Sequence, residues 1–302
     1  MGFEFKRFVP KQQPLHCILI GKQGAGKSSL LGSLAREPLL LIYNASGEAH
    51  SPDWAAKAAQ DVYKADPENV YPVRIDECEA NDSALFSEVY GEKVKFSFKT
   101  GDKLSPDFSW LKLRACLEFA KGSSVFKSVA IDSANALAPI IRGTSQWENF
   151  CKTSKGGHDN FKEADAYVDM YREIIAHFTS LKEKGMNVVM TCLAKPQFDT
   201  SGPAGENAIV PVLPAYGVVE QVIPMFMDIC VVNTVEGKPA LDFGVKAYRA
   251  SKDQAGKIKK YVHIEPRLNC APTGLQLEAL YPDLWYIHDI VKAAEQQAKE
   301  AE

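Results

Sequence analysis

Short apolar runs alternate with amphipathic stretches along much of the chain. Four runs have the length and the polar flanks of buried strands, and they span residues 15–20, 39–43, 125–131 and 188–192. Between them, apolar residues recur every three to four positions, which is the spacing of one helix face. This alternation predicts an α/β fold with a mostly parallel sheet flanked by helices.

Two of the intervening helices have recognisable ends. Ser105 supplies a cap, Pro106 a first-turn proline and Asp107 an early acid, and Gly122 follows the last apolar position. A second, longer helix stops at Gly185. Its apolar face consists of Tyr167, Tyr171, Ile174, Phe178 and Leu181.

The pattern changes in the second half of the chain. Runs at residues 228–234, 241–250 and 261–264 are typical of antiparallel strands. Glu236 and Gly237 supply a turn between the first two runs. We expect these strands to form an antiparallel C-terminal extension of the same sheet.

The domain organisation follows from the same pattern. We expect a single domain over residues 1–288, with an insertion at about residues 49–101 that contains a helix beginning at Ser51 and a strand-like run at residues 93–99. Residues 289–302 combine helical spacing with an excess of acids, which predicts an acidic helical tail.

A glycine-rich loop follows the first apolar run and matches the phosphate-binding pattern G-x-x-x-x-G-K-[ST]. Its residues are Gly21, Lys22, Gln23, Gly24, Ala25, Gly26, Lys27 and Ser28, and Ser29 continues into a helical stretch that extends to Leu34. The glycines allow backbone N–H groups, together with the start of that helix, to surround phosphate oxygens. We expect Lys27 to reach the β- and γ-phosphates of ATP and the Ser28 hydroxyl to bind Mg²⁺. The alternative is a glycine-rich turn with an incidental lysine.

An apolar run that ends in Asp132 supplies the second element of such a site. An aspartate at the end of a buried strand holds Mg²⁺ in P-loop proteins, usually through water. The alternative is that Asp132 caps the helix predicted over residues 134–141. Many P-loop motors place a glutamate directly after this aspartate to activate water, but Ser133 follows it here. We therefore expect slow hydrolysis or a base from elsewhere.

Glu48 and Thr191 are the two further catalytic candidates. Glu48 lies just past the run at residues 39–43, which we expect beside the nucleotide strand, so its carboxylate can orient water toward the γ-phosphate. Thr191 is near the end of the run at residues 188–192, where its hydroxyl can contact the γ-phosphate. The alternatives are a solvated loop glutamate and an ordinary strand threonine.

Composition narrows the choice of partners and compartment. The 302 residues carry 35 Lys and Arg against 38 Asp and Glu, a net charge of −3, so any contact with nucleic acid must come from a local patch. Seven cysteines without a C-x-x-C pair argue against a disulfide framework or a zinc site and favour the cytoplasm. No apolar run approaches the roughly 20 residues of a membrane span, so we expect no membrane partner.

The loop at residues 21–28, Asp132 with Ser133, and the helix and strand over residues 166–192 resemble the RecA-like P-loop ATPases. This family includes phage-encoded nucleotide-binding proteins and single-strand annealing recombinases, and the likeness covers about residues 15–234. It implies an ATPase that binds single-stranded DNA, in the host cytoplasm if phage-encoded, with ATP near the interfaces of a homo-oligomer. A single-strand binding protein is a further implied partner. The likeness also places Glu48 where the family has its water-activating glutamate.

The likeness also directs attention to loops that would face DNA. In residues 143–165, aromatic residues alternate with lysines, a combination that single-strand binders use. These residues are Trp147, Phe150, Lys152, Lys155, Phe161 and Lys162. The alternative is a surface loop with core aromatics. A second loop, at residues 195–217, has more acids than lysines, and a basic stretch follows at residues 252–260.

Three further observations bear on function. RecA proteins couple ATP to DNA through an Asn-Gln pair after the fourth strand, whereas residues 191–195 here are Thr-Cys-Leu-Ala-Lys. Arg267 could reach the ATP of a neighbouring subunit, or pair with Glu265. Lys22 stands where dimeric partitioning ATPases have a lysine that reaches the partner's nucleotide. The alternative function is a nucleotide-gated assembly protein without DNA activity.

Overall fold

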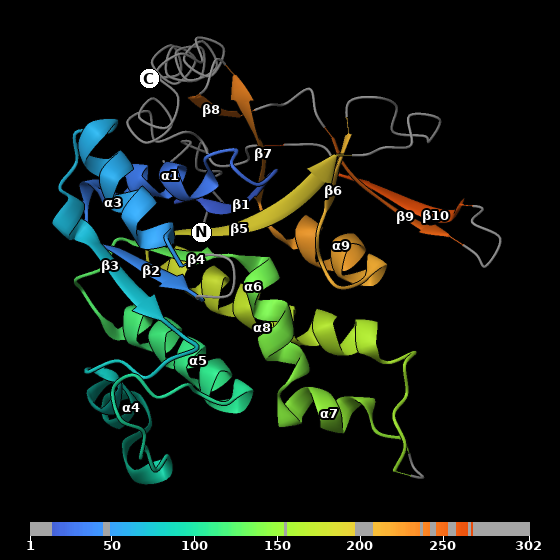
Figure 1. The fold of residues 1–302 in the computed structure, drawn as a ribbon, viewed down its shortest axis with the longest axis horizontal. Coiled ribbons are helices and arrows are strands. Elements are labelled where there is room, and N and C mark those ends of the chain that lie inside the picture. Colours follow the sequence, from blue (N-terminus) through green and yellow to red (C-terminus); the bar gives the residue numbers. More distant parts are fainter. Residues whose placement is uncertain are drawn as a thin grey trace, which may run out of the picture.

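A computed structural model describes residues 14–44, 49–153, 156–196, 208–235, 238–241, 246–252, 258–264 and 267. Its centre is a mostly parallel sheet with helices on both faces, which confirms the predicted α/β class (Figure 1). None of the described helices combines the length and apolarity that a bilayer span requires.

In the described part of the chain, the parallel part of the sheet has six strands, and the strand that precedes the glycine-rich loop, β1, is an inner one. Its strands, in spatial order, are β3 (Val70–Arg74), β2 (Leu39–Tyr43), β4 (Ser128–Asp132), β5 (Asn187–Pro196), β1 (His16–Gly21) and β7 (Asp228–Val235). β8 (Lys238–Leu241) then pairs with β7 in the antiparallel sense. The predicted antiparallel pairing of β7 is thus present on its β8 side, whereas on its other side β7 runs parallel to β1.

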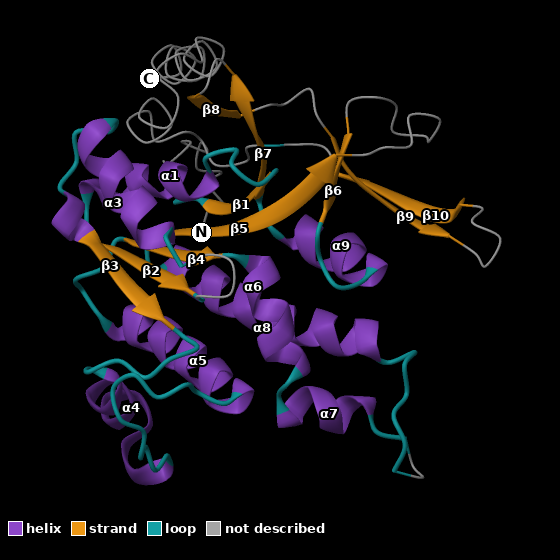
Figure 2. Cartoon of the chain, in the orientation of Figure 1, coloured by secondary structure: helices purple, strands orange, loops and turns teal. Residues whose placement is uncertain are grey.

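A second set of strands branches from the far end of β5. β6 (Ala208–Pro211) pairs with β5 in the antiparallel sense at residues 194–196, β9 (Lys246–Lys252) lies beside β6, and β10 (Ile258–Ile264) pairs antiparallel with β9. Figure 2 shows β9 and β10 projecting to one side of the helical layers. The antiparallel extension predicted for the second half is therefore present in β8, β9 and β10.

Alternating side chains of each central strand enter different cores. On β1, Ile18 and Ile20 pack in the larger core with α5 (Pro106–Gly122), α6 (Ala134–Arg142), α8 (Glu163–Glu183) and α9 (Tyr216–Val222). Cys17 and Leu19 face the smaller core beneath α1 (Lys27–Leu31) and α3 (Ser51–Asp61). Burial on both faces explains why these strands are continuous apolar runs in the sequence.

The predicted helix ends are largely confirmed. Ser105 caps α5 by accepting a hydrogen bond from the Phe108 backbone N–H, at 3.4 Å. Gly185 follows α8 with a φ of 87°, in the left-handed region that favours glycine. The helix predicted after the glycine loop is shorter than expected, because α1 passes into the 3-10 turn η1 (Gly32–Arg36). Gly32 packs against α3, where a Cβ would lie 2.8 Å from the Ala59 nitrogen.

Residues 49–101 contribute to the central sheet as well as to the periphery. They supply α3 and the edge strand β3, followed by α4 (Asp82–Tyr90), which packs on α5. The prediction of a strand at residues 93–99 is wrong. In this segment Phe96 stacks on Phe86 and Phe98 packs edge-on against Phe108, so that they form an aromatic cluster. The other described elements are α7 (Ser145–Cys151), η2 (Pro67–Asn69), η3 (Gly91–Lys93) and η4 (Ile223–Met225).

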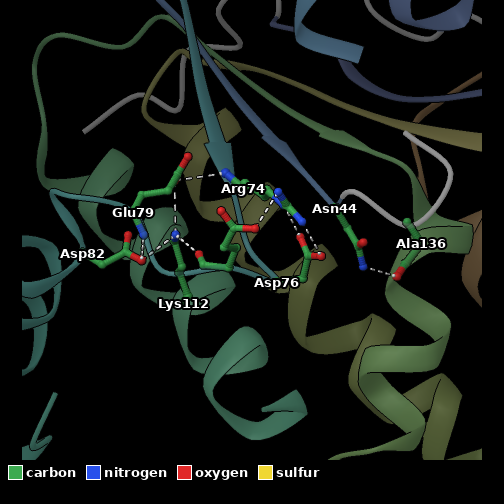
Figure 3. A network of polar contacts seen from close by, with 8 residues as sticks. Asn44, Arg74, Asp76, Glu79, Asp82, Lys112 and Ala136 are labelled. Atoms are coloured by element: carbon green, nitrogen blue, oxygen red, sulfur yellow. Dashed lines mark hydrogen bonds and ion pairs between the residues drawn. The ribbon is translucent and has the colours of Figure 1, made fainter. Parts of the chain in front are cut away.

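A buried ion network joins this region to α5 (Figure 3). The Lys112 side chain is fully buried, and its Nζ lies 2.6 Å from Asp82 and 3.1 Å from Glu79. It also donates to the Glu77 carbonyl oxygen at 3.0 Å. A buried ammonium group is tolerated only with such partners, so the network holds α4 against α5.

Candidate functional site

The glycine-rich loop is a tight turn that requires its glycines at three positions. Gly24 and Gly26 have φ values of 75° and 86°, which strain any residue with a Cβ. Gly21 ends β1 against β7, where a Cβ would lie 2.6 Å from the Val232 carbonyl oxygen. Within the loop, the Ala25 N–H donates to the Lys22 carbonyl at 3.2 Å.

Lys27 extends its side chain back toward the loop that precedes it. Its Nζ donates to the carbonyl oxygens of Gly21 and Lys22, both at 3.0 Å, and the residue is buried. Carbonyl oxygens are neutral, so these two hydrogen bonds do not cancel the positive charge of the ammonium group. An anion that enters the loop would therefore meet the positively charged Lys27 ammonium group.

Asp132 brings together three hydroxyl groups at the carboxyl end of β4. Its Oδ2 accepts from Ser28 Oγ at 2.6 Å and also from Ser51 Oγ, and its Oδ1 accepts from Thr191 Oγ1. These donors come from α1, α3 and β5. The alternative that Asp132 caps α6 is wrong, because the N-cap position is Ser133 and has no side-chain cap hydrogen bond.

The pairing of Ser28 and Asp132 suits a small divalent cation. Neighbouring ligands in an octahedral Mg²⁺ site, each about 2.1 Å from the metal, lie about 3 Å apart, close to the observed separation of the two oxygens. In the described part of the chain, no three or more His, Cys, Asp or Glu side chains cluster as a self-sufficient metal site. A cation here would therefore complete its shell with water and ligand oxygens, as Mg²⁺ usually does.

A cleft of about 880 Å³ opens beside these residues. Its lining comes from the glycine loop, the start of α3, the first turns of α6 and the end of β5. The lining residues are Gln23, Gly24, Gly26, Lys27, Ser28, Ser29, Ala49, His50, Ser51, Trp54, Ser133, Asn135, Ala136, Pro139 and Leu193. The cleft is large enough for a nucleotide, since small-molecule sites typically occupy about 300–1,000 Å³.

No protein-family model matches this chain, and no curated protein matches it. The geometry of the cleft and the chemistry of its residues are therefore the basis of the functional argument.

The structure brings only some of the predicted site residues together. Lys27, Ser28 and Ser29 line the cleft; Asp132 is buried and does not line it, but accepts a hydrogen bond from Ser28, which does. Of the remaining loop residues, Gln23, Gly24 and Gly26 line it, whereas Gly21 and Ala25 are buried and Lys22 is exposed outside the lining.

Thr191 and Glu48 differ from the other candidates. Thr191 is fully buried and does not line the cleft, so its placement does not support a direct contact with the γ-phosphate. Its hydroxyl orients Asp132 instead. Glu48 lies outside the described residues. The expectation that its strand, β2, runs beside the nucleotide strand is wrong, because β4 and β5 separate β2 from β1.

Three side chains of the site were not singled out from the sequence. Ser51 was read only as a helix start, although its hydroxyl reaches Asp132. Trp54 lies at the cleft and is 55% exposed, an unusual exposure for a tryptophan. Asn135 lines the cleft and bonds to the end of β5. The proximity of Asn135 to Asp132 in the sequence was the one available signal.

The loop expected to face DNA is only partly suited to that role. Trp147 is buried in the main core beside His158 and Tyr167, so the prediction that it is available for stacking is wrong. Phe150 and Phe161 are exposed, the latter at 93%. Lys155 and the side chains of residues 252–260 lie outside the described part of the structure.

Arg267 binds within its own chain. Its guanidinium donates to the carbonyl oxygens of Pro224, Phe226 and Met227, at 2.9, 2.8 and 3.3 Å. Its backbone also pairs with Ile229. The prediction that Arg267 presents its charge to a neighbouring subunit is not supported by these contacts. Glu265, the other predicted partner, lies outside the described residues.

Proposed function

We propose that this protein is a RecA-like P-loop ATPase that binds ATP with Mg²⁺ and hydrolyses it slowly. The observation that carries the proposal is the 2.6 Å hydrogen bond between Ser28 and Asp132, beside a nucleotide-sized cleft lined by the glycine loop and Lys27. The triphosphate would meet the glycine loop and Lys27, and Mg²⁺ would meet Ser28 and Asp132. The nucleobase would meet Trp54.

The glycine loop and Lys27 would bind the triphosphate. The loop can present backbone N–H groups to phosphate oxygens, because its glycines place no side chains in the way. Lys27 would exchange its bonds to the Gly21 and Lys22 carbonyls for charge-assisted bonds to the β- and γ-phosphates. Its position inside the loop supports this exchange, since only the end of the side chain needs to move.

Ser28 and Asp132 would hold Mg²⁺, which neutralises charge on the phosphate oxygens. Ser28 supplies a hydroxyl oxygen and Asp132 a carboxylate, directly or through water. Ser51 and Thr191 fix the carboxylate by donating to its two oxygens. Such supporting hydrogen bonds orient the residues that hold a metal.

The water-activating group determines how fast the phosphate is released. A serine hydroxyl such as that of Ser133 is too weak a base to activate water, so slow turnover is expected. Glu48 is our proposed base because the resemblance to RecA-like ATPases places the water-activating glutamate at this position. A phosphate-release assay tests the enzyme. We expect release from the wild type, loss of release in Lys27→Ala, and retained ATP binding without turnover in Glu48→Gln. Lys103→Ala, on an exposed side chain, is the control. Wild-type protein without release, or Lys27→Ala with unchanged release, would refute hydrolysis at this site.

Trp54 offers a surface for the nucleobase. It is exposed at the rim of the cleft, and Lys57 Nζ lies 6.0 Å from its ring centroid. Aromatic side chains stack on purines at low entropic cost. We expect the adenine ring to lie against Trp54.

Single-stranded DNA is the second element of the proposal, and the exposed Phe161 supports it. Lys162 is its direct neighbour in the chain, and the Lys162 Nζ donates to the Lys152 carbonyl oxygen at 3.4 Å. Lysines and exposed aromatic rings together bind single strands. We further expect a homo-oligomer in the cytoplasm, with a single-strand binding protein as a possible partner.

The alternative is a nucleotide-gated assembly protein that does not use DNA. Binding of oligo-dT at several salt concentrations, with ATP and Mg²⁺, distinguishes the two. Affinity that falls as salt rises supports DNA binding through lysines. No binding at low salt, together with an ATP-dependent change in oligomeric state, supports the alternative.

A further inference from the structure

We propose that Asn135 is a positioning residue that couples the nucleotide cleft to the β5–β6 strand pair. Occupancy of the cleft would then change the stability of the strand pair, and the strand pair would change nucleotide affinity by the same factor. This inference rests on the proposed nucleotide site and adds to it a route by which binding is transmitted.

Asn135 closes a ring of three hydrogen bonds. Its Oδ1 accepts from the Leu193 N–H at 2.5 Å, and its Nδ2 donates to the Val212 carbonyl oxygen. The Val212 N–H in turn donates to the Leu193 carbonyl at 2.8 Å. The side chain therefore joins the end of β5 to the residue after β6.

The chemistry of an asparagine is specifically suited to this ring. One end of its amide accepts and the other donates, as the two backbone partners require. An aspartate could still accept from Leu193 but would place a carboxylate oxygen against the Val212 carbonyl. An alanine could do neither.

Asn135 and Leu193 also belong to the cleft. Both line it, and Leu193 is the register partner of Gly21, the first residue of the glycine loop. Asn135 lies three positions after Asp132, in the first turn of α6. A ligand between the loop and Asp132 would therefore be next to both ends of the Asn135–Leu193 bond.

The remainder of this helical turn is held in place. The Tyr171 hydroxyl donates to the Ala134 carbonyl at 2.6 Å, and Asn44 Nδ2 donates to the Ala136 carbonyl at 3.1 Å (Figure 3). The backbone on both sides of Asn135 is thus tied to α8 and to the end of β2. A change in the cleft at this point would be transmitted mainly through the Asn135 side chain.

Amide hydrogen exchange tests the proposal without requiring DNA. Exchange is measured in peptides that contain Leu193 and Val212, with and without a saturating non-hydrolysable ATP analogue and Mg²⁺. Saturation removes any effect of a change in affinity. We expect the nucleotide to slow exchange there by about fivefold or more in the wild type, in line with typical coupling strengths.

Three variants complete the experiment. Asn135→Ala should abolish the nucleotide response at both positions, and Asn135→Asp should preserve more of the response at Leu193 than at Val212. Asn149→Ala, an exposed asparagine on α7, should respond as the wild type does. If Asn135→Ala does not fold, Asn135→Asp alone carries the comparison.

The outcomes are separable. Absence of nucleotide binding by the wild type would refute the proposed function and the coupling with it. Binding without a change in exchange, or an unchanged response in Asn135→Ala and Asn135→Asp, would overturn the coupling alone. Loss of nucleotide binding in Asn135→Ala would make Asn135 a direct ligand instead of a positioning residue.

Discussion

Ser28 Oγ donates a hydrogen bond to Asp132 Oδ2 at 2.6 Å, although the two residues are 104 positions apart in the chain. The bond joins the start of α1 to the end of β4 across the intervening strand β5. Ser28 lines the cleft, and Asp132 lies buried directly behind it, which is where we place Mg²⁺.

Asp132→Asn should weaken Mg²⁺-dependent nucleotide binding. The substitution removes the charge that faces the cation and places an amide group against a hydroxyl donor. Hydrogen bonds and contacts to charged groups are typically worth about 1.5–3 kcal/mol, so we expect roughly a tenfold or greater loss of MgATP affinity. Titration with MgATP and with ATP plus a chelator measures this loss of affinity. Asp61→Asn, at an exposed position of α3, is the control. An Asp132→Asn protein with unchanged Mg²⁺ dependence would move the cation elsewhere.

Lys112→Met should destabilise the fold while leaving the cleft intact. It removes the partner of the buried Asp82 carboxylate, and breaking a buried pair typically costs about 3–5 kcal/mol. Denaturant unfolding measures the free energy of unfolding. Lys103→Met, on an exposed residue, should change it by less than about 0.5 kcal/mol. The double variant Lys112→Met/Asp82→Leu should recover part of the loss, and a single variant as stable as wild type would contradict the structural role.

Two glycine substitutions should act in opposite directions. In Gly21→Ala the new Cβ would meet the Val232 carbonyl at 2.6 Å, so the strands must separate, at a cost of about 1–3 kcal/mol. In Gly122→Ala the Cβ meets nothing within 4 Å, and we expect a gain of about 0.4–1 kcal/mol. Thermal or denaturant unfolding compares them. Equal effects of the two substitutions would count against the close packing of the loop strand.

His16 should make the protein less stable in mild acid. Burial is the main cause that lowers its pKa below 6.5, and Lys182 also lowers it; a backbone hydrogen bond and, to a smaller extent, Asp228 oppose the shift. Its Nδ1 accepts from the Met227 N–H at 3.3 Å, which requires the neutral ring. The unfolded chain then binds more protons, so stability is full above about pH 6.5 and is lost as pH falls through the lowered pKa.

The measurement is the free energy of unfolding at pH 7.5 and at pH 5.5. His16→Phe should reduce the difference between these two values. His177, whose pKa burial also lowers, should account for part of what remains. A His16→Phe protein with the full wild-type pH dependence would exclude His16 as a source.

Phe161→Ser should weaken binding of single-stranded DNA. Stacking of a base on an aromatic ring is worth about 1–3 kcal/mol, so oligo-dT affinity should fall roughly fivefold or more. Fluorescence anisotropy with labelled oligo-dT measures the affinity. Val62→Ser, which removes another exposed apolar side chain at the end of α3, should leave it unchanged. Equal affinity of wild type and Phe161→Ser would remove this loop from the DNA proposal.

Local patterns predicted the elements that sequence chemistry determines directly. The bounds of β2 and α5 and the buried face of α8 agree with apolar spacing and with the Ser105 cap. β3 was missed because it is a half-exposed edge strand that contains Pro72, a residue that normally argues against a strand.

The parts of the site that the sequence could not predict depend on long-range pairing. Ser51 and Thr191 reach Asp132 only because tertiary packing brings the start of α3 and the strand β5 to the end of β4, and strand order is not encoded in any local pattern. Strand order also explains why β2, which we expected beside β1, is separated from it by β4 and β5. Trp147 was predicted to be available for stacking because it lies among lysines in the sequence, but it belongs to the core.

The most direct test of the account is equilibrium binding of MgATP, measured by isothermal titration for the wild type, Lys27→Ala and Lys103→Ala. The account predicts that the wild type and Lys103→Ala bind with equal affinity and that Lys27→Ala binds at least about tenfold more weakly, because it loses charge-assisted bonds to phosphate. A wild type that does not bind MgATP, or a Lys27→Ala protein that binds it as tightly as the wild type, would contradict the account.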